Sequence, residues 1–293
     1  MSKRTTSLSA ASSGSFPLGG ELTVNRLGYG AMRLTGDGVW GPPKDRAKAI
    51  AVLRRAIELG INFIDTADSY GPNVSEELIA EALAPYPKDL VIATKGGWNR
   101  PGPKQWTHDA SPAHLRKAVE GSLKRLRLDR IDVYQLHVPD PVVPLDASIE
   151  TLANMQAEGK IRFVALSNVT VEHIERARRI VPIASVQNRY SFADREWDNV
   201  VDYCERNGIA FIPWFPLGAG TVAGRLLERI ANARRAKPIQ IALAWLLKRS
   251  QVMLPIPGTS SIAHLEQNVQ AAALQLSEEE YVELTGIVEL ASC

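Results

Sequence analysis

Four ionisable side chains follow apolar runs of the chain, and together they could transfer a proton to a small molecule. Asp65 and Tyr70 stand in Asn-Phe-Ile-Asp-Thr-Ala-Asp-Ser-Tyr-Gly, while Lys95 and His137 each end an apolar run. A phenol has an ordinary pKa of about 10, too high for easy proton transfer at neutral pH. A neighbouring ammonium would lower the pKa of Tyr70, Asp65 would hold that ammonium, and His137 could orient a carbonyl oxygen. The set predicts carbonyl reduction with the phenol as proton donor.

Each of these residues also has a structural interpretation. Asp65 and Lys95 could form a structural ion pair, His137 could be a hydrogen-bonded core histidine, and Tyr70 could anchor a loop. Lys95 could instead be the Schiff-base nucleophile of a lyase. The lyase is disfavoured because the lysine is accompanied by an acid and a tyrosine rather than by an apolar sheath. The joint pattern favours the reductase.

The elements that would position these residues alternate between strand and helix. Short apolar runs suit buried parallel strands, and amphipathic runs follow them. Strands are expected at Leu27–Met32, Asn62–Asp65, Leu90–Lys95, Ile131–His137, Ile161–Ser167, Ala184–Gln187, Ala210–Trp214 and Val252–Ile256. Helices are expected at Ala47–Leu59, Ser75–Leu83, 111–126, Ser148–Ala157, Val171–Ile180, Arg195–Asn207, Pro238–Arg249, Ser261–Ala272 and from Ser277 onward. Eight such units predict an α/β fold, a (β/α)8 TIM barrel, whose active site lies at the C-terminal ends of the strands.

The ends of the chain add to this plan. Phe16–Val24, with two glycines in its middle, predicts an N-terminal β-hairpin before the barrel that could close its floor. Residues 1–15 are rich in Ser and Thr and lack the apolar core of a signal peptide, so we expect a disordered tail. The remainder, residues 16–293, is expected to form one barrel domain with extra C-terminal helices.

Composition narrows the classes of partner. The 293 residues are 45% hydrophobic and 23% charged, with a formal net charge of +2 and the two signs interspersed, which favours neither nucleic acid nor a membrane surface. The two cysteines, Cys204 and Cys293, form no metal-binding or disulfide pattern. We therefore expect a cytoplasmic enzyme without a metal, as a monomer or weak homo-oligomer.

The four residues and their surroundings resemble the aldo-keto reductase superfamily from about Phe16 to Glu289. The stretch from Asn62 to Gly71 is similar to the family's active-site signature, and Lys95 and His137 match its catalytic lysine and histidine. The resemblance implies an NADP-dependent oxidoreductase that reduces an aldehyde or ketone to an alcohol, with Asp65, Tyr70, Lys95 and His137 as catalytic residues. A nucleotide-binding redox sensor without turnover is the further alternative, which the complete set of four disfavours.

The resemblance also implies a set of cofactor-binding residues. Ser167, Asn168 and Gln187 match residues that bind the nicotinamide carboxamide, and Trp214 stands where an aromatic ring usually stacks on the nicotinamide. Met32 ends the first strand and is expected against the ribose. The positions near the diphosphate, the 2′-phosphate and the adenine are Pro216, Leu217, Gly218, Pro257, Gly258, Thr259, Ser260, His264, Gln267 and Asn268.

The sequence departs from many family members in this last segment. They carry Lys at the position of Gly258 and Arg at the position of His264, and both charges are missing here. Hydroxyl groups and a helix N-terminus remain, which suit a phosphate, so NADPH is favoured and NADH use stays open. A Rossmann site is not expected, because Arg33 replaces the third glycine after Gly28 and Gly30.

A subgroup likeness points to a substrate. Arg26–Met32, Gly38–Arg46 and Ile256–Ser261 resemble bacterial pyridoxal reductases, which implies pyridoxal as a candidate among small carbonyl compounds. Trp40, Trp98 and Trp106 stand in loops after the first and third strands and are expected to line an apolar substrate pocket.

Overall fold

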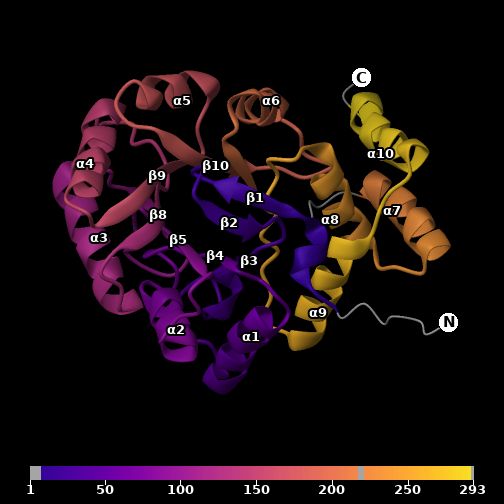
Figure 1. The fold of residues 1–293 in the computed structure, drawn as a ribbon, viewed down its shortest axis with the longest axis horizontal. Coiled ribbons are helices and arrows are strands. Elements are labelled where there is room, and N and C mark those ends of the chain that lie inside the picture. The colour runs from indigo at the N-terminus through magenta and orange to yellow at the C-terminus, as the bar shows by residue number, and fades with distance from the viewer. Residues whose placement is uncertain (1–7, 217–220, 292–293) are drawn as a thin grey trace.

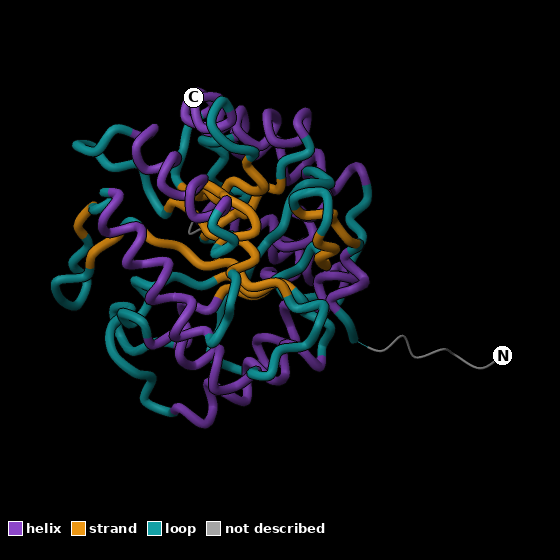
Figure 2. The backbone as a smooth tube through the Cα atoms, turned by 60° about the vertical axis from the view of Figure 1, so that its left-hand side comes forward, coloured by secondary structure: helices purple, strands orange, loops and turns teal. Residues whose placement is uncertain are grey.

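The computed structural model describes residues 8–216 and 221–291, and its centre is a ring of parallel strands. Seven strands pair side by side in the order β11-β10-β9-β8-β5-β4-β3, and each neighbouring pair is parallel. Helices surround the strands on the outside (Figures 1 and 2). The strands are β3 (Tyr29–Gly30), β4 (Phe63–Asp65), β5 (Val91–Gly96), β8 (Ile131–Leu136), β9 (Ile161–Ser167), β10 (Ile183–Arg189) and β11 (Ala210–Trp214). The predicted (β/α)8 barrel is confirmed.

The eighth position of the ring differs from the prediction. Val252–Ile256 is not a regular strand and forms only an isolated bridge between Phe211 and Met253. Phe211 donates its N–H to Val252 O and accepts from Leu254 N, both at 2.8 Å, and Gly28 N donates to Pro255 O at 3.0 Å. Pro255 and Pro257 have no N–H to donate, so a full ladder cannot form. This segment closes the ring as an irregular seam between β11 and β3.

The predicted hairpin is confirmed and lies across the centre of the ring (Figure 1). Its strands, β1 (Ser15–Leu18) and β2 (Leu22–Asn25), are antiparallel. Phe16, Leu18 and Val24 belong to the same buried core as Phe63 and Val133 of the barrel strands. Burial of these apolar side chains fixes the hairpin against the barrel.

The prediction of a disordered tail is wrong for residues 8–15. Ala10–Ser13 forms the short 3-10 helix η1, in which Ala10 is fully buried. Ala10 N donates to Leu59 O at 2.8 Å, and the Ser13 hydroxyl accepts from Leu27 N at 3.0 Å. These contacts order the chain from Leu8 onward, and residues 1–7 lie outside the described residues.

Most helices begin and end close to the predicted positions. They are α1 (Arg46–Glu58), α2 (Val74–Leu83), α3 (Pro112–Leu126), α4 (Leu145–Ala157), α5 (Val171–Arg178), α6 (Asp198–Asn207), α7 (Thr221–Arg234), α8 (Pro238–Arg249), α9 (Ile262–Gln270) and α10 (Glu278–Ala291). Ser111 caps α3 by accepting from His114 N, and Ser277 and Glu280 form the expected capping box of α10. The prediction missed α7, although the buried Leu227, Ile230 and Ala231 have helical spacing.

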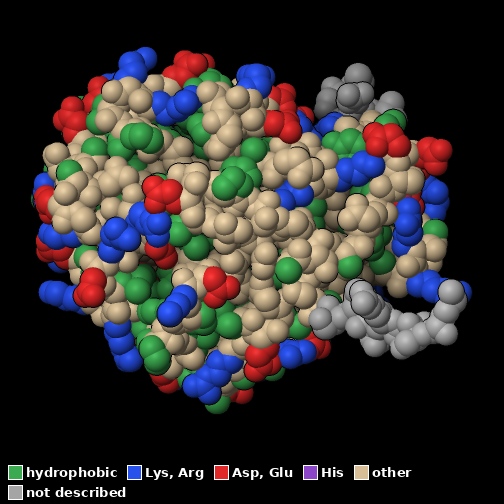
Figure 3. Space-filling model, viewed as in Figure 1, with side chains coloured by type: hydrophobic (Ala, Val, Ile, Leu, Met, Phe, Trp, Pro, Cys, Tyr) green, Lys and Arg blue, Asp and Glu red, His purple; other side chains and the backbone are tan. Residues whose placement is uncertain are grey.

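The distribution of charged side chains and the state of Cys204 agree with what the composition predicted. Acidic and basic side chains are interspersed on the face shown in Figure 3. Cys204 is buried, and burial raises the pKa of its thiol to about 12, so it stays protonated; Cys293 lies outside the described residues. No helix among the described residues is long and apolar enough to cross a membrane.

Candidate active site

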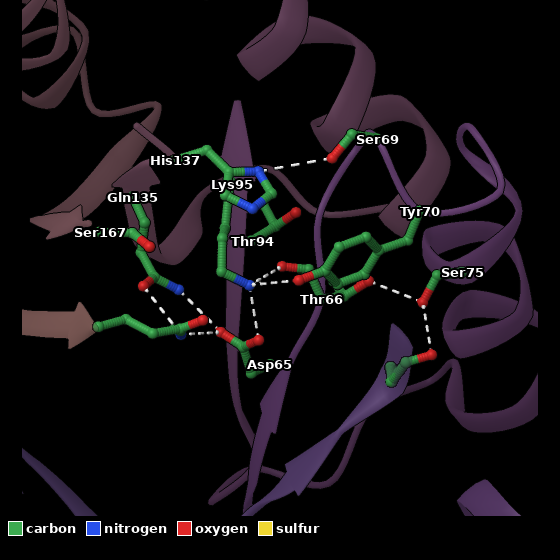
Figure 4. A network of polar contacts seen from close by, with 12 residues as sticks. Asp65, Thr66, Ser69, Tyr70, Ser75, Thr94, Lys95, Gln135, His137 and Ser167 are labelled. Carbon is green, nitrogen blue, oxygen red and sulfur yellow. Dashed lines mark hydrogen bonds and ion pairs between the residues drawn. The ribbon is translucent and has the colours of Figure 1, made fainter. Parts of the chain in front are cut away.

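Lys95 is the centre of a buried polar network at the C-terminal ends of the strands (Figure 4). Its ammonium, on β5, lies 2.6 Å from Asp65 Oδ2 and 3.3 Å from the Tyr70 hydroxyl, and it donates to Thr66 O at 2.9 Å. The Lys95 side chain is fully buried. A charge in such a place requires a partner and further hydrogen bonds, and the ammonium has three acceptors. The structure therefore brings together three of the four predicted catalytic residues.

Asp65 is held from its other side by two amides. Gln135 Nε2 and Gln187 Nε2 each donate to Asp65 Oδ1 at 2.8 Å. Sequence reasoning missed Gln135, although a glutamine inside the apolar run Ile131–Leu136 was a usable signal. We call Asp65, Tyr70, Lys95, Gln135 and Gln187 the interior network.

The pKa of Tyr70 is raised above its ordinary value, contrary to the net lowering that the sequence predicted. Burial of the phenol raises it, and the nearby Lys95 ammonium opposes that shift without reversing it. The prediction considered the charge and not the cost of burying a phenolate. At neutral pH the phenol keeps its proton, which is the form required of a proton donor.

The pKa values of Lys95 and His137 are shifted in opposite directions. Burial alone would lower that of Lys95, but Asp65 and Tyr70 outweigh it and raise the pKa. Burial, with the nearby Lys95 charge, holds the pKa of His137 well below 6.5. Lys95 is therefore charged and His137 neutral at neutral pH, and a protonated buried amine is a poor Schiff-base nucleophile.

His137 completes the site from the end of β8. Its ring packs edge-on against Tyr70, with centroids 5.9 Å apart, and its Nδ1 lies 3.5 Å from the Ser69 hydroxyl. Trp98 and Trp106 also approach it edge-on, at 6.3 and 6.5 Å. A neutral imidazole in this position can donate one hydrogen bond to an oxygen beside the Tyr70 hydroxyl.

Two cavities meet at Tyr70. The larger, of about 630 Å³, is lined by His137, Trp98, Trp106 and Ser167; the smaller, of about 200 Å³, is lined by Met32, Pro216, Pro257 and Gly258. Tyr70, Gln187 and Trp214 line both. The Tyr70 phenol therefore lies between two cavities, where it could contact two bound molecules at the same time.

Trp40 does not line either of these cavities, in contrast to Trp98 and Trp106. Its ring lies 5.6 Å from the Arg100 guanidinium, and its backbone bridges to Gly71. Arg100, which sequence reasoning missed, also stacks on Trp106 at 3.7 Å and donates to Ser69 O at 2.9 Å. Arg100 thus ties the loop of the first strand to the walls of the larger cavity.

The residues predicted to bind the carboxamide already contact one another. Asn168 Nδ2 donates to His137 O at 3.0 Å, and Asn168 Oδ1 accepts from Trp214 Nε1 at 3.1 Å. Ser167 accepts from the same Asn168 amide at 3.0 Å, and all three lie in the wall of the larger cavity. These contacts fix the orientation of the Trp214 ring.

The remaining predicted cofactor residues extend away from Tyr70. Thr259 is buried and its hydroxyl accepts from Ser261 N at 3.1 Å, whereas Ser260 and His264 are exposed near the start of α9. Asn268 is buried on α9, and Gln267 O accepts from Gln240. Leu217 and Gly218 lie outside the described residues. Among the residues that are described, no group of His, Cys, Asp and Glu has the arrangement of a metal site.

Comparison with known proteins identifies the class. A sequence model of the aldo/keto reductase family matches residues 26–289, so the chain belongs to this family and is an oxidoreductase. It is 52% identical over 267 residues to an uncharacterized oxidoreductase of Schizosaccharomyces pombe, covering 90% of this chain and 87% of that protein. It is 49% identical over 283 residues to pyridoxine 4-dehydrogenase of Escherichia coli, covering 94% and 99%.

A solved structure agrees with the barrel. An aldo-keto reductase from Klebsiella pneumoniae, in complex with NADPH, superposes with a TM-score of 0.78 and 28% identity, covering 94% of each chain. The predicted family, the fold and the likeness to pyridoxine 4-dehydrogenase are thereby confirmed.

Proposed function

We propose that this enzyme reduces a small aldehyde or ketone to an alcohol, with NADPH as the hydride donor and Tyr70 as the general acid. The observation that carries the proposal is the position of the Tyr70 hydroxyl, 3.3 Å from the buried Lys95 ammonium and in the wall shared by two cavities. One barrel domain, residues 16–293, would hold both molecules.

The smaller cavity fits a nicotinamide ring. Trp214 offers an aromatic face there, Met32 an apolar contact and Gln187 an amide, while Ser167 and Asn168 offer a hydroxyl and an amide in the wall of the adjoining larger cavity. The bound nucleotide would supply a hydride to the carbonyl carbon. The NADPH-bound relative from Klebsiella pneumoniae supports this assignment of the cofactor.

The protein's own residues would then manage the developing negative charge on the carbonyl oxygen. His137 donates a hydrogen bond that orients the oxygen, and Tyr70 gives it a proton. Lys95 stabilises the phenolate that Tyr70 becomes, and Asp65 keeps the ammonium in position. Gln135 and Gln187 hold Asp65 through its second oxygen.

The larger cavity supports an aromatic substrate. Trp98 and Trp106 form an edge-to-face pair with centroids 5.9 Å apart in its wall, and the His108 ring lies tilted against Trp98 with centroids 4.3 Å apart. We propose pyridoxal as the substrate to test first, on the likeness to the Escherichia coli pyridoxine 4-dehydrogenase. A panel of aldehydes with NADPH and then NADH, followed by loss of nicotinamide absorbance, ranks the alternatives.

The Tyr70→Phe variant tests the central assignment. The change removes only the hydroxyl, so we expect kcat to fall by about 10³-fold or more, because the proton donor is lost. NADPH binding, followed by fluorescence, should stay within about 2-fold, because the phenyl ring keeps the packing. Unchanged turnover in this variant would refute the assignment.

A further inference from the structure

The seam that closes the barrel leaves no room for a side chain at position 258. A Cβ added to Gly258 would lie 2.7 Å from Gly30 O, and a Cβ added to Gly30 would lie 2.6 Å from Ile256 O. Both neighbours are backbone atoms, so the two segments would have to separate to admit any larger residue. Glycine at 258, where many relatives have Lys, is therefore a requirement of how this seam is packed.

The side chain of Arg33 approaches position 258 from the neighbouring segment. The Cβ position of residue 258 lies 3.5 Å from Arg33 Cγ, so the Arg33 side chain passes over Gly258. Arg33 belongs to η2 (Ala31–Leu34), directly after β3, and it is exposed. Arg46 and Arg55 of the neighbouring α1 pair with glutamates, whereas Arg33 takes part in no ion pair among the described residues.

Arg33 also joins the reaction site to the start of α9. It lines the smaller cavity together with Tyr70 and Gly258, and it lines a further cavity of about 440 Å³ together with Lys48 and Ser260. Met32 is shared by both cavities. A molecule extended from Tyr70 towards Ser260 would therefore pass Arg33.

The charges around this further cavity sum to a positive value. Its bases are Arg33, Lys44 and Lys48, and its acids are Asp37 and Asp45. Asp37 pairs with Lys44 at 3.0 Å, and the Asp45 carboxylate accepts from Lys48 N at 2.9 Å as the N-cap of α1. Because the carboxylates of Asp37 and Asp45 already have partners within this segment, the positive charge of the cavity favours a bound anion.

We infer that Arg33 binds the 2′-phosphate of NADPH, supplying across the seam the charge that many relatives carry at the position of Gly258. The inference rests on the proposed function. A guanidinium presents parallel N–H donors that match two phosphate oxygens, and the exposed Ser260 lines the same cavity.

Nucleotide affinity measured separately for NADPH and NADH tests the inference. We expect Arg33→Ala to raise the Kd for NADPH by about 10- to 100-fold and to leave the Kd for NADH within about 2-fold, because only NADPH carries the 2′-phosphate. The Kd of Arg33→Lys for NADPH should lie between those of the wild type and of Arg33→Ala. Arg179→Ala is the matched control, because Arg179 is also exposed but follows the end of α5, at the opposite end of the barrel.

A probe without nicotinamide separates this inference from the proposed function. Adenosine 2′,5′-bisphosphate should raise the Tm of the wild type more than AMP does, and Arg33→Ala should remove the difference. If Arg33→Ala weakens NADPH and NADH equally, the guanidinium serves a phosphate common to both and the inference is wrong. Wild type that binds both nucleotides equally also overturns it while leaving the reductase intact, whereas wild type that binds neither overturns the proposed function itself.

A substitution at position 258 tests how tightly the seam is packed. We expect Gly258→Lys to fail to restore NADPH preference in the Arg33→Ala background, because a side chain at 258 meets Gly30 O. Restored NADPH preference in a double variant with the wild-type Tm would show that the seam does admit a side chain at this position.

Discussion

Asp65 and Asp68 stand in one short motif and are both buried, yet their surroundings are opposite. Asp65 has an ammonium on one oxygen and two amides on the other. Asp68 Oδ1 has no hydrogen-bond partner among the described residues, and burial, with the nearby Glu76 carboxylate, raises its pKa to about 8. The two carboxyl groups therefore differ in their partners, and the raised pKa keeps Asp68 protonated at neutral pH.

The difference originates in β5, whose neighbouring side chains point to opposite faces. Lys95 points into the barrel and meets Asp65, whereas Thr94 points outward and donates to Glu76 at 2.6 Å. Glu76 also accepts from Arg125 at 2.6 Å. We call Asp68, Glu76, Thr94 and Arg125 the outer cluster. The Asp65 carboxylate therefore has partners on both oxygens, whereas the outer cluster holds two carboxyl groups, Asp68 and Glu76, and a single arginine.

Removing the ammonium should have the largest effect. We expect Lys95→Met to lower kcat by about 10²- to 10⁴-fold and the free energy of unfolding by about 3–5 kcal/mol, because Asp65 is left as an unpaired buried charge. The measurements are steady-state kinetics and urea unfolding.

A double variant sharpens this prediction. Adding Asp65→Asn removes the stranded charge and keeps an oxygen for Gln135 and Gln187, so most of the lost stability should return while activity does not. A double variant less stable than Lys95→Met would contradict the assigned cost of the charge.

The pH dependence of reduction should show an intermediate effect. Because the pKa of Tyr70 is raised above 10 and that of His137 lies well below 6.5, both groups keep their working forms between these values. We expect kcat/KM for reduction to be flat from about pH 7 to pH 9 and to fall about tenfold per unit only above the pKa of Tyr70. An inflection between pH 7 and pH 9 would mean that the Lys95 ammonium, and not burial, determines the direction of the Tyr70 pKa shift.

Asp68→Asn should have the smallest effect on turnover, and its effect on stability should depend on pH. The folded-state pKa of about 8 lies above the unfolded value of 3.8, so the stability from keeping Asp68 protonated is full below the unfolded pKa and lost as pH rises through 8. The variant should therefore gain stability relative to wild type as pH rises, by up to about 4 kcal/mol more at pH 9 than at pH 5. Urea unfolding at the two pH values checks this, and equal differences at both would contradict it.

The sequence predicted the interior network better than the outer cluster. Asp65, Tyr70, Lys95 and His137 follow apolar strands, and barrel topology alone places the ends of those strands together. It could not give the direction of the Tyr70 pKa, because that depends on how far water is excluded. Gln135 stands out as a glutamine in an apolar run, but neither its position nor that of Arg100 indicates which residues each contacts.

The segment that closes the ring also shows what the sequence could not predict. The run Val252–Ile256 has the apolar composition of a strand, and only the two prolines in and after it indicate that ladder bonds would be absent. Trp40 was predicted in the substrate pocket by its loop, but its actual neighbour, Arg100, comes from a different loop. Such contacts depend on tertiary packing rather than on spacing.

The irregular seam has a consequence for how the barrel changes shape. Between β8 and β9 a continuous register holds the strands from Ile131 to Leu136, whereas the seam joins β11 to β3 by a few isolated bonds. If the barrel widens or narrows around a bound molecule, we expect the change to be concentrated at this seam, because it has few backbone hydrogen bonds. Backbone amides beside this seam, such as those of Leu254 and Gly28, should then exchange their hydrogens fastest among the strands and slow most when nucleotide binds.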